Sequence, residues 1–595
     1  MATVYRENLS GIEYSTKSFP LKQILPNFTV TMEKRWVFKE QPTAAQVKSL
    51  AESINVSGVL SSLLLQRNIV DFEQAKCFFR PKLDMLHDPF LMMDMDRAVE
   101  RINRAIQKNQ KILVYGDYDV DGTTSVALVY DFLRNIHEHV NFYIPDRYTE
   151  GYGISLKGID YADDNNFELI ISLDCGIKAI DKVAYANEKN IDFIICDHHR
   201  PGDELPAAHA VLDPKRNDCS YPFDELSGCG VGFKLMQALC IQNEIPIKNL
   251  YEYLDLVAVS IAADIVPIVG ENRVLAHYGL KKLNANPSVG LQALMNISGK
   301  KNNYDITSVV FTIGPRINAA GRISHAGASV DLLVNGNTEV AAGLASKINA
   351  HNIERRGLDT MISEEAFRMI AGGDEKKKST VLFKKDWHKG VIGIVASRCI
   401  EKSYKPTIIL TESNNRATGS ARSVRGFDVY EAIAACSDLL EQFGGHKYAA
   451  GLTLPLENVK LFQEKFEAIV ASTITEEQLV PQIDIDQKID LDIITQKFFS
   501  VLNQMAPFGP QNMSPIFATD NIVATQLKKL RGDHVKFTTK QEGVDQTFVA
   551  IGFGFGKYFD LLSSGMSFSI AYTVEENDYL GNKSLQLYLK DIKFD

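Results

Sequence analysis

The sequence predicts an α/β protein made of two lobes, joined by a long helix and followed by a small C-terminal β-barrel. In the first half of the chain, short runs of β-branched residues alternate with helical patterns, and the same alternation returns over a shorter stretch further on. The last part of the chain contains mainly strand-like segments. Apolar strands separated by helices are typical of a parallel sheet covered on both faces, whereas successive short strands are typical of a sandwich or barrel.

Residues 1–105 are predicted to be an N-terminal helical region, because 44–54 and 94–107 carry apolar residues at helical spacing. The opening residues lack a basic segment followed by an apolar one, so we expect no secretion signal. The most apolar long run, 254–269, is interrupted by Asp264 and is shorter than the ~20 residues that span a membrane. We therefore expect no membrane segment and a cytoplasmic protein.

Residues 106–334 form the first predicted lobe. Strand-like runs occupy 111–115, 167–173 and 191–196, helical segments lie between them, and a mostly helical stretch follows. The strands are almost continuously apolar, which predicts a parallel sheet that is buried on both faces. Binding sites in such sheets form beyond the carboxyl ends of the strands.

The rest of the chain divides into three further predicted parts. Residues 335–372 have a polar-faced helical pattern without the apolar density of a core, which indicates a linker helix. Residues 373–480 repeat the strand–helix–strand pattern and predict a second, smaller α/β domain. Residues 481–595 carry about five short strands, which fits a small barrel such as an OB-fold, although periodicity alone leaves the kind of barrel open.

Composition limits the class of protein. The 595 residues suggest about four domains at ~150 residues each, and 45% hydrophobic residues exclude wholesale disorder. There are 64 Lys and Arg against 74 Asp and Glu, a formal charge of −10, which argues against a protein that coats nucleic acid indiscriminately. The eight cysteines form no CxxC pair, so a zinc ribbon or disulfide scaffold is not expected.

Polar clusters follow each of the three predicted strands of the first lobe. The first strand is followed by Asp117, Asp119 and Asp121, the second by Asp174, and the third by an Asp-His-His motif that contains His198 and His199. A further carboxylate, Asp264, ends an apolar helix and is placed to reach the same edge of the sheet. Any one of these motifs alone also fits a helix cap or a solvated turn, but all three at successive strand ends predict a shared site.

Carboxylates that share one cleft repel one another unless a cation neutralises them. Oxygen ligands with one or two imidazoles suit Mn²⁺ or Mg²⁺, and a pair of such ions about 3.5–4 Å apart serves phosphoryl transfer. For Asp121 the sequence leaves three roles open: a helix N-cap, a hydrogen-bond acceptor behind the ligands, or a ligand.

The second lobe offers candidate phosphate-binding residues. Ser420, Arg422 and Arg425 lie in one segment, and Gly444, Gly445, His446 and Lys447 lie in another. Adjacent glycines let a phosphate approach the backbone, and a helix starting after them would point its N–H groups at the anion, although a simple tight turn is the alternative. From the first lobe, Arg316 is a further phosphate candidate, while Arg322 also fits a structural role between helices.

The predicted barrel contains one short basic stretch. Lys528, Lys529, Arg531 and Lys536 lie close together in the sequence, opposed by a single Asp533. Such a loop fits a groove that follows a phosphate backbone, with Phe537, Phe548 and Phe553 as candidate stacking partners. The alternative is a solvated hairpin in which the phenylalanines belong to the core.

Taken in order, the motifs GDYDVDGTTS, DCGI, DHH and ADIVP resemble those of the DHH phosphoesterase superfamily. Segments 80–102, 314–323 and 507–517 are similar to its RecJ branch of single-strand-specific 5′ exonucleases, and the resemblance runs from about residue 36 onward. It implies metal ligation by Asp117, Asp119, Asp174, His198 and Asp264, with Asp174 between two ions. For His199 it leaves two roles open, a partner behind the ligands or a group that faces the phosphate. Many smaller members carry a histidine where this chain has Leu113, which leaves the coordination of one ion open.

The resemblance also implies roles for the phosphate-binding candidates. A 5′-terminal phosphate would be bound by Arg316, Ser420 and Arg422. Gly444, Gly445 and His446 would belong to the substrate-binding motif of the DHH-associated domain, with His446 stabilising charge at the scissile phosphate. Arg425 stands where the branch often carries another residue, so it receives no role.

The leading hypothesis is a metal-dependent 5′→3′ exonuclease that degrades single-stranded DNA to 5′-mononucleotides in DNA repair and recombination. The resemblance implies a monomer whose partners include a helicase and a single-strand-binding protein. One alternative is a DHH phosphodiesterase acting on short oligoribonucleotides or cyclic dinucleotides, against which the N-terminal region and barrel argue. A second alternative is a catalytically silent DNA-binding scaffold, against which the complete set of acids argues.

Overall fold

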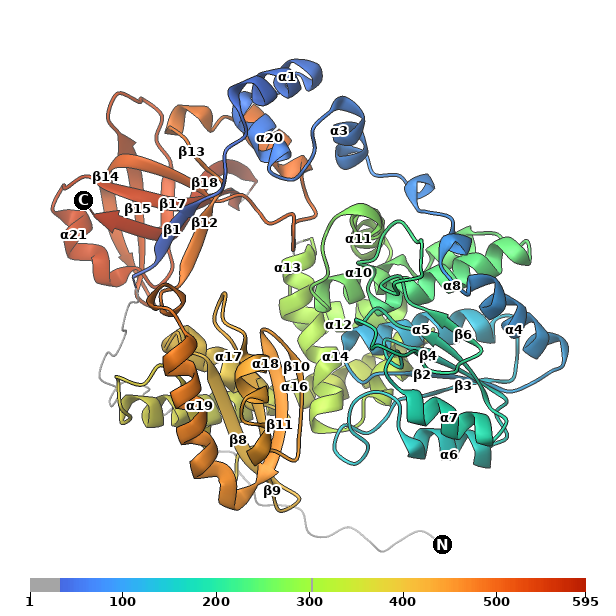
Figure 1. The fold of residues 1–595 in the computed structure, drawn as a ribbon. Coiled ribbons are helices and arrows are strands. Elements are labelled where there is room, and N and C mark those ends of the chain that lie inside the picture. Colours follow the sequence, from blue (N-terminus) through green and yellow to red (C-terminus); the bar gives the residue numbers. More distant parts are fainter. Residues whose placement is uncertain (1–32, 301–302, 580, 595) are drawn as a thin grey trace, which may run out of the picture.

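The computed structural model describes residues 33–300, 303–579 and 581–594 (Figure 1). Two α/β lobes are joined by one long helix, and a β-barrel follows them, so the predicted fold class is confirmed. No helix in these described ranges has both the length and the apolar character needed to cross a membrane.

The first lobe is built on a five-stranded parallel sheet in the order β3-β2-β4-β5-β6. Its strands are β2 (Ile112–Gly116), β3 (Val140–Tyr143), β4 (Leu169–Leu173), β5 (Asp192–Cys196) and β6 (Ala210–Leu212). The chain reverses direction across the sheet between the neighbouring strands β2 and β4. In open parallel sheets this reversal leaves a crevice at the carboxyl ends of the two strands, and ligands bind there.

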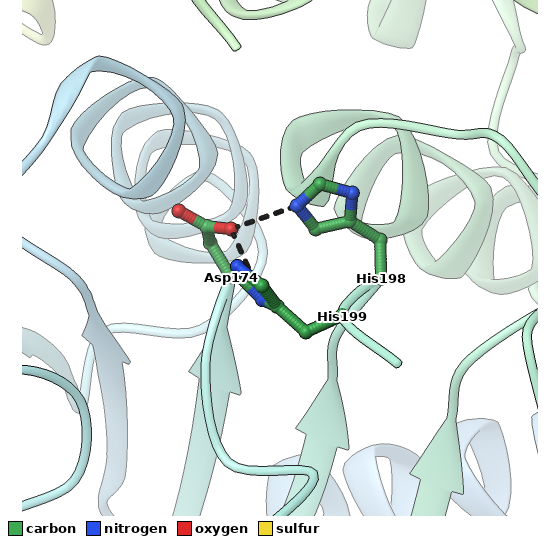
Figure 2. Close-up of side chains that lie close together, drawn as sticks. All are labelled: Asp174, His198 and His199. Carbon is green, nitrogen blue, oxygen red and sulfur yellow. Dashed lines mark hydrogen bonds and ion pairs between the residues drawn. The ribbon is translucent and has the colours of Figure 1, made fainter. Parts of the chain in front are cut away.

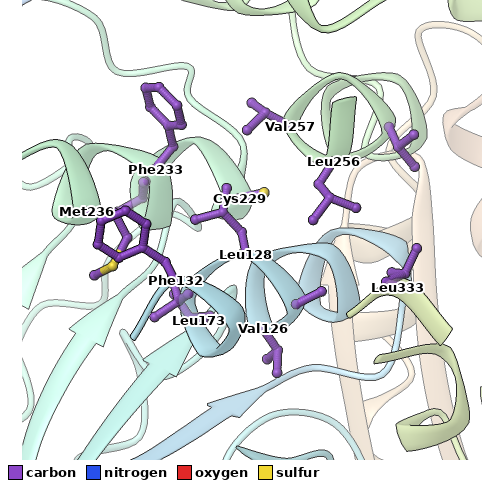
Figure 3. Packing of buried hydrophobic residues seen from close by; sticks show 14 of the residues in the cluster. Val126, Leu128, Phe132, Leu173, Cys229, Phe233, Met236, Leu256, Val257 and Leu333 are labelled. Carbon is purple, nitrogen blue, oxygen red and sulfur yellow. The ribbon is translucent and has the colours of Figure 1, made fainter. Parts of the chain in front are cut away.

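Helices cover both faces of this sheet. Helices α4 (Met95–Gln107), α5 (Val120–Arg134), α8 (Gly228–Gln242) and α10 (Leu254–Ala263) share one apolar core with the sheet, and α6 (Leu156–Asp164) and α7 (Ile180–Glu188) cover the other face. Figure 3 shows α5 packed through Leu128 and Phe132 against Phe233 of α8 and Leu256 of α10. The helices α9 (Lys248–Tyr251), α11 (Gly270–Ala285), α12 (Val289–Ser298), α13 (Ile306–Ser308), α14 (Gly314–Ile323) and α15 (Gly327–Leu333) complete the lobe.

The predicted linker helix is α16 (Thr338–Ala371), a single helix of 34 residues. It leads to the second lobe, a five-stranded sheet in the order β10-β11-β9-β8-β7. Its strands are β7 (Thr380–Phe383), β8 (Thr407–Ser413), β9 (Arg416–Arg422), β10 (Gln442–His446) and β11 (Ala449–Pro455). Helix α17 (Ile392–Lys402) packs between this sheet and α16, and α18 (Val429–Ala434) and α19 (Val459–Thr473) cover the other face.

The barrel has the strand order β13-β14-β15-β16-β18-β17 and is closed by pairing between β14 and β17. Its strands are β13 (Gln487–Lys488), β14 (Phe517–Leu530), β15 (His534–Gln541), β16 (Val549–Gly552), β17 (Phe568–Tyr579) and β18 (Asn582–Phe594). Helices α20 (Gln496–Gln504) and α21 (Phe559–Ser563) add apolar residues to its core. Closure removes the free sheet edges that would otherwise invite pairing with other chains.

The part of the predicted N-terminal helical region that the structure describes contains four α-helices, and these helices pack on two different bodies. Its first described element is a strand, β1 (Arg35–Phe38), which pairs in parallel with β12 (Gln482–Ile485) ahead of the barrel. Helices α1 (Ala44–Ile54), α2 (Gly58–Leu65) and α3 (Phe72–Phe79) pack with the barrel, whereas α4 packs on the first lobe. Helical spacing identifies the apolar face of a helix but not the part of the protein against which that face packs. Residues 1–32 of the predicted region lie outside the described residues.

Candidate metal centre and phosphate-binding residues

Asp117 and Asp119 lie in the turn between β2 and α5. Asp119 is the N-cap of α5, and its carboxylate accepts a hydrogen bond from the backbone N–H of Gly122 at 3.0 Å. Asp117 is fully buried, and its Oδ2 has no hydrogen-bond partner among the described residues. Gly122 is required here, because a Cβ at that position would lie 2.3 Å from the carbonyl oxygen of Asp117. The tight turn therefore brings both carboxylates to the end of β2.

Asp174 directly follows β4, next to the end of β2. Its backbone φ of +59° lies in the left-handed region, which is uncommon for residues other than glycine. The first residue of α8 packs against it so closely that a Cβ on Gly228 would lie 2.7 Å from the Cβ of Asp174. Strained backbone of this kind persists where the surrounding structure fixes it, and it is concentrated at functional sites.

His198 faces three carboxylates. Its Nε2 lies 3.1 Å from Oδ1 of Asp174, 3.5 Å from Oδ2 of Asp264 and 3.7 Å from Oδ2 of Asp121. Figure 2 shows the rings of His198 and His199 both directed toward the carboxylate of Asp174. The structure thus brings together residues that follow β4, β5 and α10.

Asp197 orients the two histidines without facing the cluster itself. Its Oδ1 accepts hydrogen bonds from the backbone N–H of His198 at 2.8 Å and lies 2.7 Å from Nδ1 of His199. Its Oδ2 accepts from the backbone N–H of Ile177 at 2.9 Å. Burial raises the pKa of Asp197, but the hydrogen bond and charge of His199 outweigh burial and lower it to about 2. Asp197 therefore remains ionised and holds the motif in place.

Asp121 is not the N-cap of α5, because Asp119 occupies that position. The carboxylate of Asp121 accepts from the backbone N–H groups of Gly228 at 2.7 Å and Cys229 at 2.9 Å. It also accepts from the Ser260 hydroxyl at 2.7 Å. Asp121 thus joins α5 to the N-terminus of α8 and to α10 while its Oδ2 still faces His198. Of the three roles that the sequence left open, this geometry favours a hydrogen-bond acceptor behind the ligands.

The clustered carboxylates have strongly perturbed acidities. Burial and the charge of Asp119 raise the pKa of Asp117 to about 8, and burial and the charges of Asp121 and Asp119 raise that of Asp264 to about 8. Burial and the surrounding aspartates also raise the pKa of Asp174. The repulsion between these carboxylates is reduced either when they take up protons or when they bind cations.

The donor set fits divalent cations. Two groups of ligand atoms, Asp117–Asp119–Asp174 and Asp174–His198–His199, each lie within 4.8 Å of one another, and Asp174 belongs to both. Asp121, His198 and Asp264 form a third such group. Carboxylate oxygens with imidazole nitrogens suit Mn²⁺ or Mg²⁺, and the unpartnered Oδ2 of Asp117 is available to a cation. Leu113 lies fully buried on β2 in the core facing α6 and α7, so its position supplies no ligand.

Ser420 and Arg422 lie on β9 in the second lobe, and Nη1 of Arg422 donates to the Ser420 hydroxyl at 3.1 Å. Of the two alternatives for the glycine pair, the structure shows the tight turn and not a helix start: Gly444 and Gly445 lie on the edge strand β10, which pairs with β11. Gly445 has a φ of +146°, and a Cβ there would lie 2.3 Å from the Ala449 carbonyl oxygen. These glycines therefore allow a tight hairpin that carries the exposed His446 at its end.

Arg316 and Arg322 lie on the same helix, α14, but have different surroundings. The hydrogen bonds of Arg316 go to Asn349 at 3.1 Å and to the carbonyl of Thr312 at 2.6 Å. Arg322 donates to the carbonyl of Gly390 in the second lobe at 2.9 Å and lies within electrostatic range of Arg422. The structure therefore brings Arg322, rather than Arg316, to the residues of β9.

Sequence reasoning missed an arginine cluster that spans both lobes. Burial and the charges of Arg147, Arg355 and Arg422 lower the pKa of Arg322 to about 10. Arg147 lies over the ring of Tyr118, 3.9 Å from its centroid, and its charge also acts on Asp117 and Asp119. The sequence analysis named Arg322 and Arg422 separately, but it did not name Arg147 and Arg355. The four lie in different segments of the chain, so no local motif indicated that they belong together. We refer to Arg147, Arg322, Arg355 and Arg422 as the arginine cluster.

Arg425 has a structural contact: its Nη1 pairs with Oδ2 of Asp484 at 2.5 Å, on the strand β12 that leads toward the barrel. In the barrel, Lys528, Lys529, Arg531 and Lys536 are exposed on the hairpin of β14 and β15. Phe537 and Phe548 are buried core residues, whereas Phe553 is 57% exposed and stacks on Tyr588 with ring centroids 5.8 Å apart. Of the three candidate stacking residues, Phe553 alone remains available.

Three family descriptions match this chain: "DHH family, N-terminal domain" over residues 111–261, "DHHA1 domain" over 376–472, and "RecJ OB domain" over 485–591. The single-stranded-DNA-specific exonuclease RecJ of Bacillus subtilis is 37% identical over 562 residues, covering 94% of this chain and 70% of the relative. RecJ of Escherichia coli is 31% identical, covering 84% of this chain and 90% of the relative.

Solved structures agree with these relatives. The crystal structure of RecJ from Thermus thermophilus in complex with Mn²⁺ has a TM-score of 0.82 at 26% identity and covers 94% of this chain and 80% of that one. A crystal structure of exonuclease RecJ bound to manganese has a TM-score of 0.58 at 30% identity and covers 67% of this chain and 98% of that one. The chain therefore belongs to the RecJ family of single-stranded-DNA-specific exonucleases within the DHH phosphoesterases.

Proposed function

We propose that this protein is a Mn²⁺- or Mg²⁺-dependent exonuclease that degrades single-stranded DNA from its 5′ end and releases 5′-mononucleotides. The observation that carries the proposal is the position of the arginine cluster beside the acid–histidine cluster. Arg147 interacts electrostatically with Asp117 and Asp119 on one side and with Arg322 on the other. A cation-binding centre next to a group of guanidinium groups is suited to hydrolysis of a phosphodiester.

Five side chains of the first lobe are proposed to hold two ions: Asp117, Asp119, Asp174, His198 and Asp264. When bound, the ions supply an activated water at neutral pH and stabilise negative charge on the phosphate. Asp174 would contribute to both ions: its carboxylate forms a group with those of Asp117 and Asp119, and its Oδ1 lies 3.1 Å from Nε2 of His198. Asp121 and Asp197 are proposed to position these side chains through the hydrogen bonds that tie them to α8, α10 and the backbone of the histidine motif.

His199 is proposed to face the scissile phosphate as a cation. Burial lowers its pKa, but the hydrogen bond and charge of Asp197 outweigh burial and raise it to about 9. Its Nδ1 lies 2.7 Å from Oδ1 of Asp197, and its Nε2 lies 3.3 Å from the hydroxyl of Tyr152. A protonated imidazole held in this way can donate to a non-bridging phosphate oxygen.

The arginine cluster is proposed to set the polarity of digestion. A terminal phosphate carries more negative charge than a phosphodiester, so Arg322 and Arg422, with Ser420, favour an end that carries a phosphate, which we propose to be the 5′ end. Because the charge of Arg147 acts both on Arg322 and on Asp117 and Asp119, we infer that a 5′ phosphate anchored here directs the next diester toward the metal centre. Burial and the charge of Arg422 lower the pKa of His446, and this interaction supports a role for that histidine with the same group.

The barrel is proposed to hold the strand that leads away from the active site. The exposed basic residues of the β14–β15 hairpin lie next to Phe553, whose ring contacts His534 with centroids 5.1 Å apart. Positive charge that follows the backbone and aromatic rings that stack on bases are the two elements of sequence-tolerant single-strand binding.

The cysteines bear on the cellular compartment of the protein. All eight cysteines are free in the described structure, which is consistent with a reducing compartment, and we propose a cytoplasmic monomer. A helicase that supplies single strands and a single-strand-binding protein are proposed partners, by resemblance to the family.

The decisive experiment digests single strands that carry a label at either end and either a phosphate or a hydroxyl at the 5′ end, in the presence of Mn²⁺. We expect 5′-mononucleotides released from the 5′ end, faster with the phosphate. Release from the 3′ end would refute the polarity. Preferential turnover of dinucleotides over long strands would favour a small-substrate phosphodiesterase, and unchanged activity of Asp119→Ala would refute the site.

A further inference from the structure

The loop between α20 and β14, residues 505–513, packs against the segment that follows Asp264. We propose that this loop, which we call the docking loop, is a positioning element for Asp264, so that the barrel contributes to metal binding as well as to DNA binding. The inference rests on the proposed metal-dependent function, because Asp264 is taken there as a metal ligand.

The first contact lies four residues after Asp264. The backbone N–H of Ile268 donates to the carbonyl of Pro510 at 2.8 Å, and the Ile268 side chain is fully buried. A Cβ on Gly509 would lie 2.5 Å from Cγ1 of Ile268, so the docking loop approaches as closely as a glycine allows. Any side chain at position 509 must push the two segments apart or displace Ile268.

The second contact is Arg273 on α11. Its guanidinium donates to the carbonyls of Met505 at 2.9 Å and Ala506 at 3.0 Å, and its Nε donates to the carbonyl of Phe78 at 3.0 Å. The guanidinium carbon lies 3.7 Å from the centroid of the Phe78 ring. One buried side chain of the first lobe thus binds both the docking loop and α3, which belong to the barrel side of the molecule.

The docking loop is itself held rigid at these carbonyls. The side-chain amide of Asn512 donates to the carbonyls of Met505 and Pro507, both at 2.9 Å. Its oxygen accepts from Nε of Arg67 at 2.8 Å, and Nη2 of Arg67 donates to the carbonyl of Met513 at 2.7 Å. The loop therefore presents a preformed surface to Ile268 and Arg273.

The segment between Asp264 and Ile268 needs such support. Ile265 is β-branched, has a φ of +62° and is 65% exposed, so its own side chain does not stabilise that conformation. Asn272, next to Arg273, donates to the carbonyl of Pro267 at 3.1 Å. The Asp264 side chain is 27% exposed, against 3% for Asp174, so its position depends more on the backbone than on packing around it.

The test uses Gly509→Ala, whose added Cβ pushes the docking loop away from Ile268. Ile268→Ala makes room for that Cβ, so the double variant should restore the contact between the two segments. Gly336→Ala is the matched control, because its Cβ meets no atom within 4 Å. Each full-length protein is measured for Mn²⁺ affinity by calorimetry, for thermal unfolding, and for turnover of a 5′-phosphorylated oligonucleotide shorter than the ~4 nucleotides of the smallest OB-fold sites. Arg273→Lys, which keeps the charge but loses the fork of donors, is a second, independent variant.

We expect Gly509→Ala and Arg273→Lys to weaken Mn²⁺ binding by roughly tenfold or more, as loss of partners behind metal ligands does, and to slow turnover of the short oligonucleotide. The double variant should regain much of the affinity. If the folded variants keep the parental Mn²⁺ affinity, the proposal is overturned. If such variants also bind long strands less well, the docking loop serves DNA binding and not metal binding. If Asp264→Asn itself leaves Mn²⁺ binding unchanged, the ligand assignment fails instead.

Discussion

The acid–histidine cluster of the first lobe and the arginine cluster between the lobes are electrostatic opposites built in different ways. In the first, burial and neighbouring carboxylates raise the pKa values of Asp117 and Asp264 to about 8. In the second, burial and neighbouring guanidinium groups lower the pKa of Arg322 to about 10. Each cluster gathers like charges, and a ligand of opposite charge would reduce the repulsion between them. For the acids that ligand would be a divalent cation, and for the arginines it would be a phosphate.

The two clusters also differ in how the chain assembles them. The acids follow successive strands of one parallel sheet, so the order of the strands brings them together. The arginines come from a loop after β3, from α14, from the linker helix α16 and from β9 of the other lobe. The acid cluster is therefore a property of one lobe, whereas the arginine cluster requires both lobes in their mutual position.

The largest effect is expected from the acids. Asp174→Asn should lower exonuclease activity by more than about a hundredfold, because even loss of a partner behind a metal ligand costs roughly 10–100-fold. Asp174 belongs to two of the three ligand groups, so its loss disturbs both proposed ions. Activity would be measured on a 5′-phosphorylated single strand, and thermal unfolding would show that the variant is folded. A variant with near-parental activity would mean that the centre lies elsewhere.

The arginine cluster provides the next largest effect. Arg322→Ala should reduce the preference for a 5′ phosphate over a 5′ hydroxyl by roughly ten- to a hundredfold, since hydrogen bonds to charged groups contribute about 1.5–3 kcal/mol. Arg316→Ala, on the same helix, is the matched control and should change the preference much less, because its hydrogen bonds go to Asn349 and Thr312. The reverse order of effects would restore the assignment that the sequence suggested.

A pH dependence follows from the acid cluster. Asp117 and Asp264, with pKa values of about 8, hold protons at neutral pH in the metal-free protein, and cations must displace them. Mn²⁺ affinity should therefore rise as the pH rises through about 8, with proton release that calorimetry in buffers of different ionisation enthalpy detects. An affinity that stays constant between about pH 6 and pH 8 would contradict the raised pKa values.

The smallest effect is expected in the barrel. Phe553→Ala should weaken binding of long single strands by about 1–3 kcal/mol, the usual contribution of one stacked base, while turnover of very short oligonucleotides stays the same. Phe553 is exposed, so the substitution should leave the unfolding temperature nearly unchanged. By contrast, Phe537→Ala removes a core residue that is 1% exposed and should lower stability instead. Equal effects of both variants on DNA binding would remove the stacking role.

The sequence by itself determined the class of fold and the acid–histidine cluster. Apolar strands with intervening helices specify a parallel sheet, and such a sheet places residues after successive strands at one edge, so Asp117, Asp174 and His198 were predictable as neighbours. Local sequence patterns predicted less where a segment packs against a part of the chain that is distant in the sequence. The pair Gly444–Gly445 fitted either a helix start or a tight turn, and only the pairing of its strand with β11 decided for the tight turn.

Only the tertiary structure decided the remaining features. It divided the N-terminal helices between the barrel and the first lobe, brought Arg322 into contact with Gly390 of the second lobe and buried Phe537 while leaving Phe553 exposed. It also placed Pro510 of the docking loop on Ile268, close to Asp264. The physical reason is common to all of these: periodicity and motif spacing report which face of an element is apolar or charged, whereas the identity of the facing element depends on how the lobes and barrel pack.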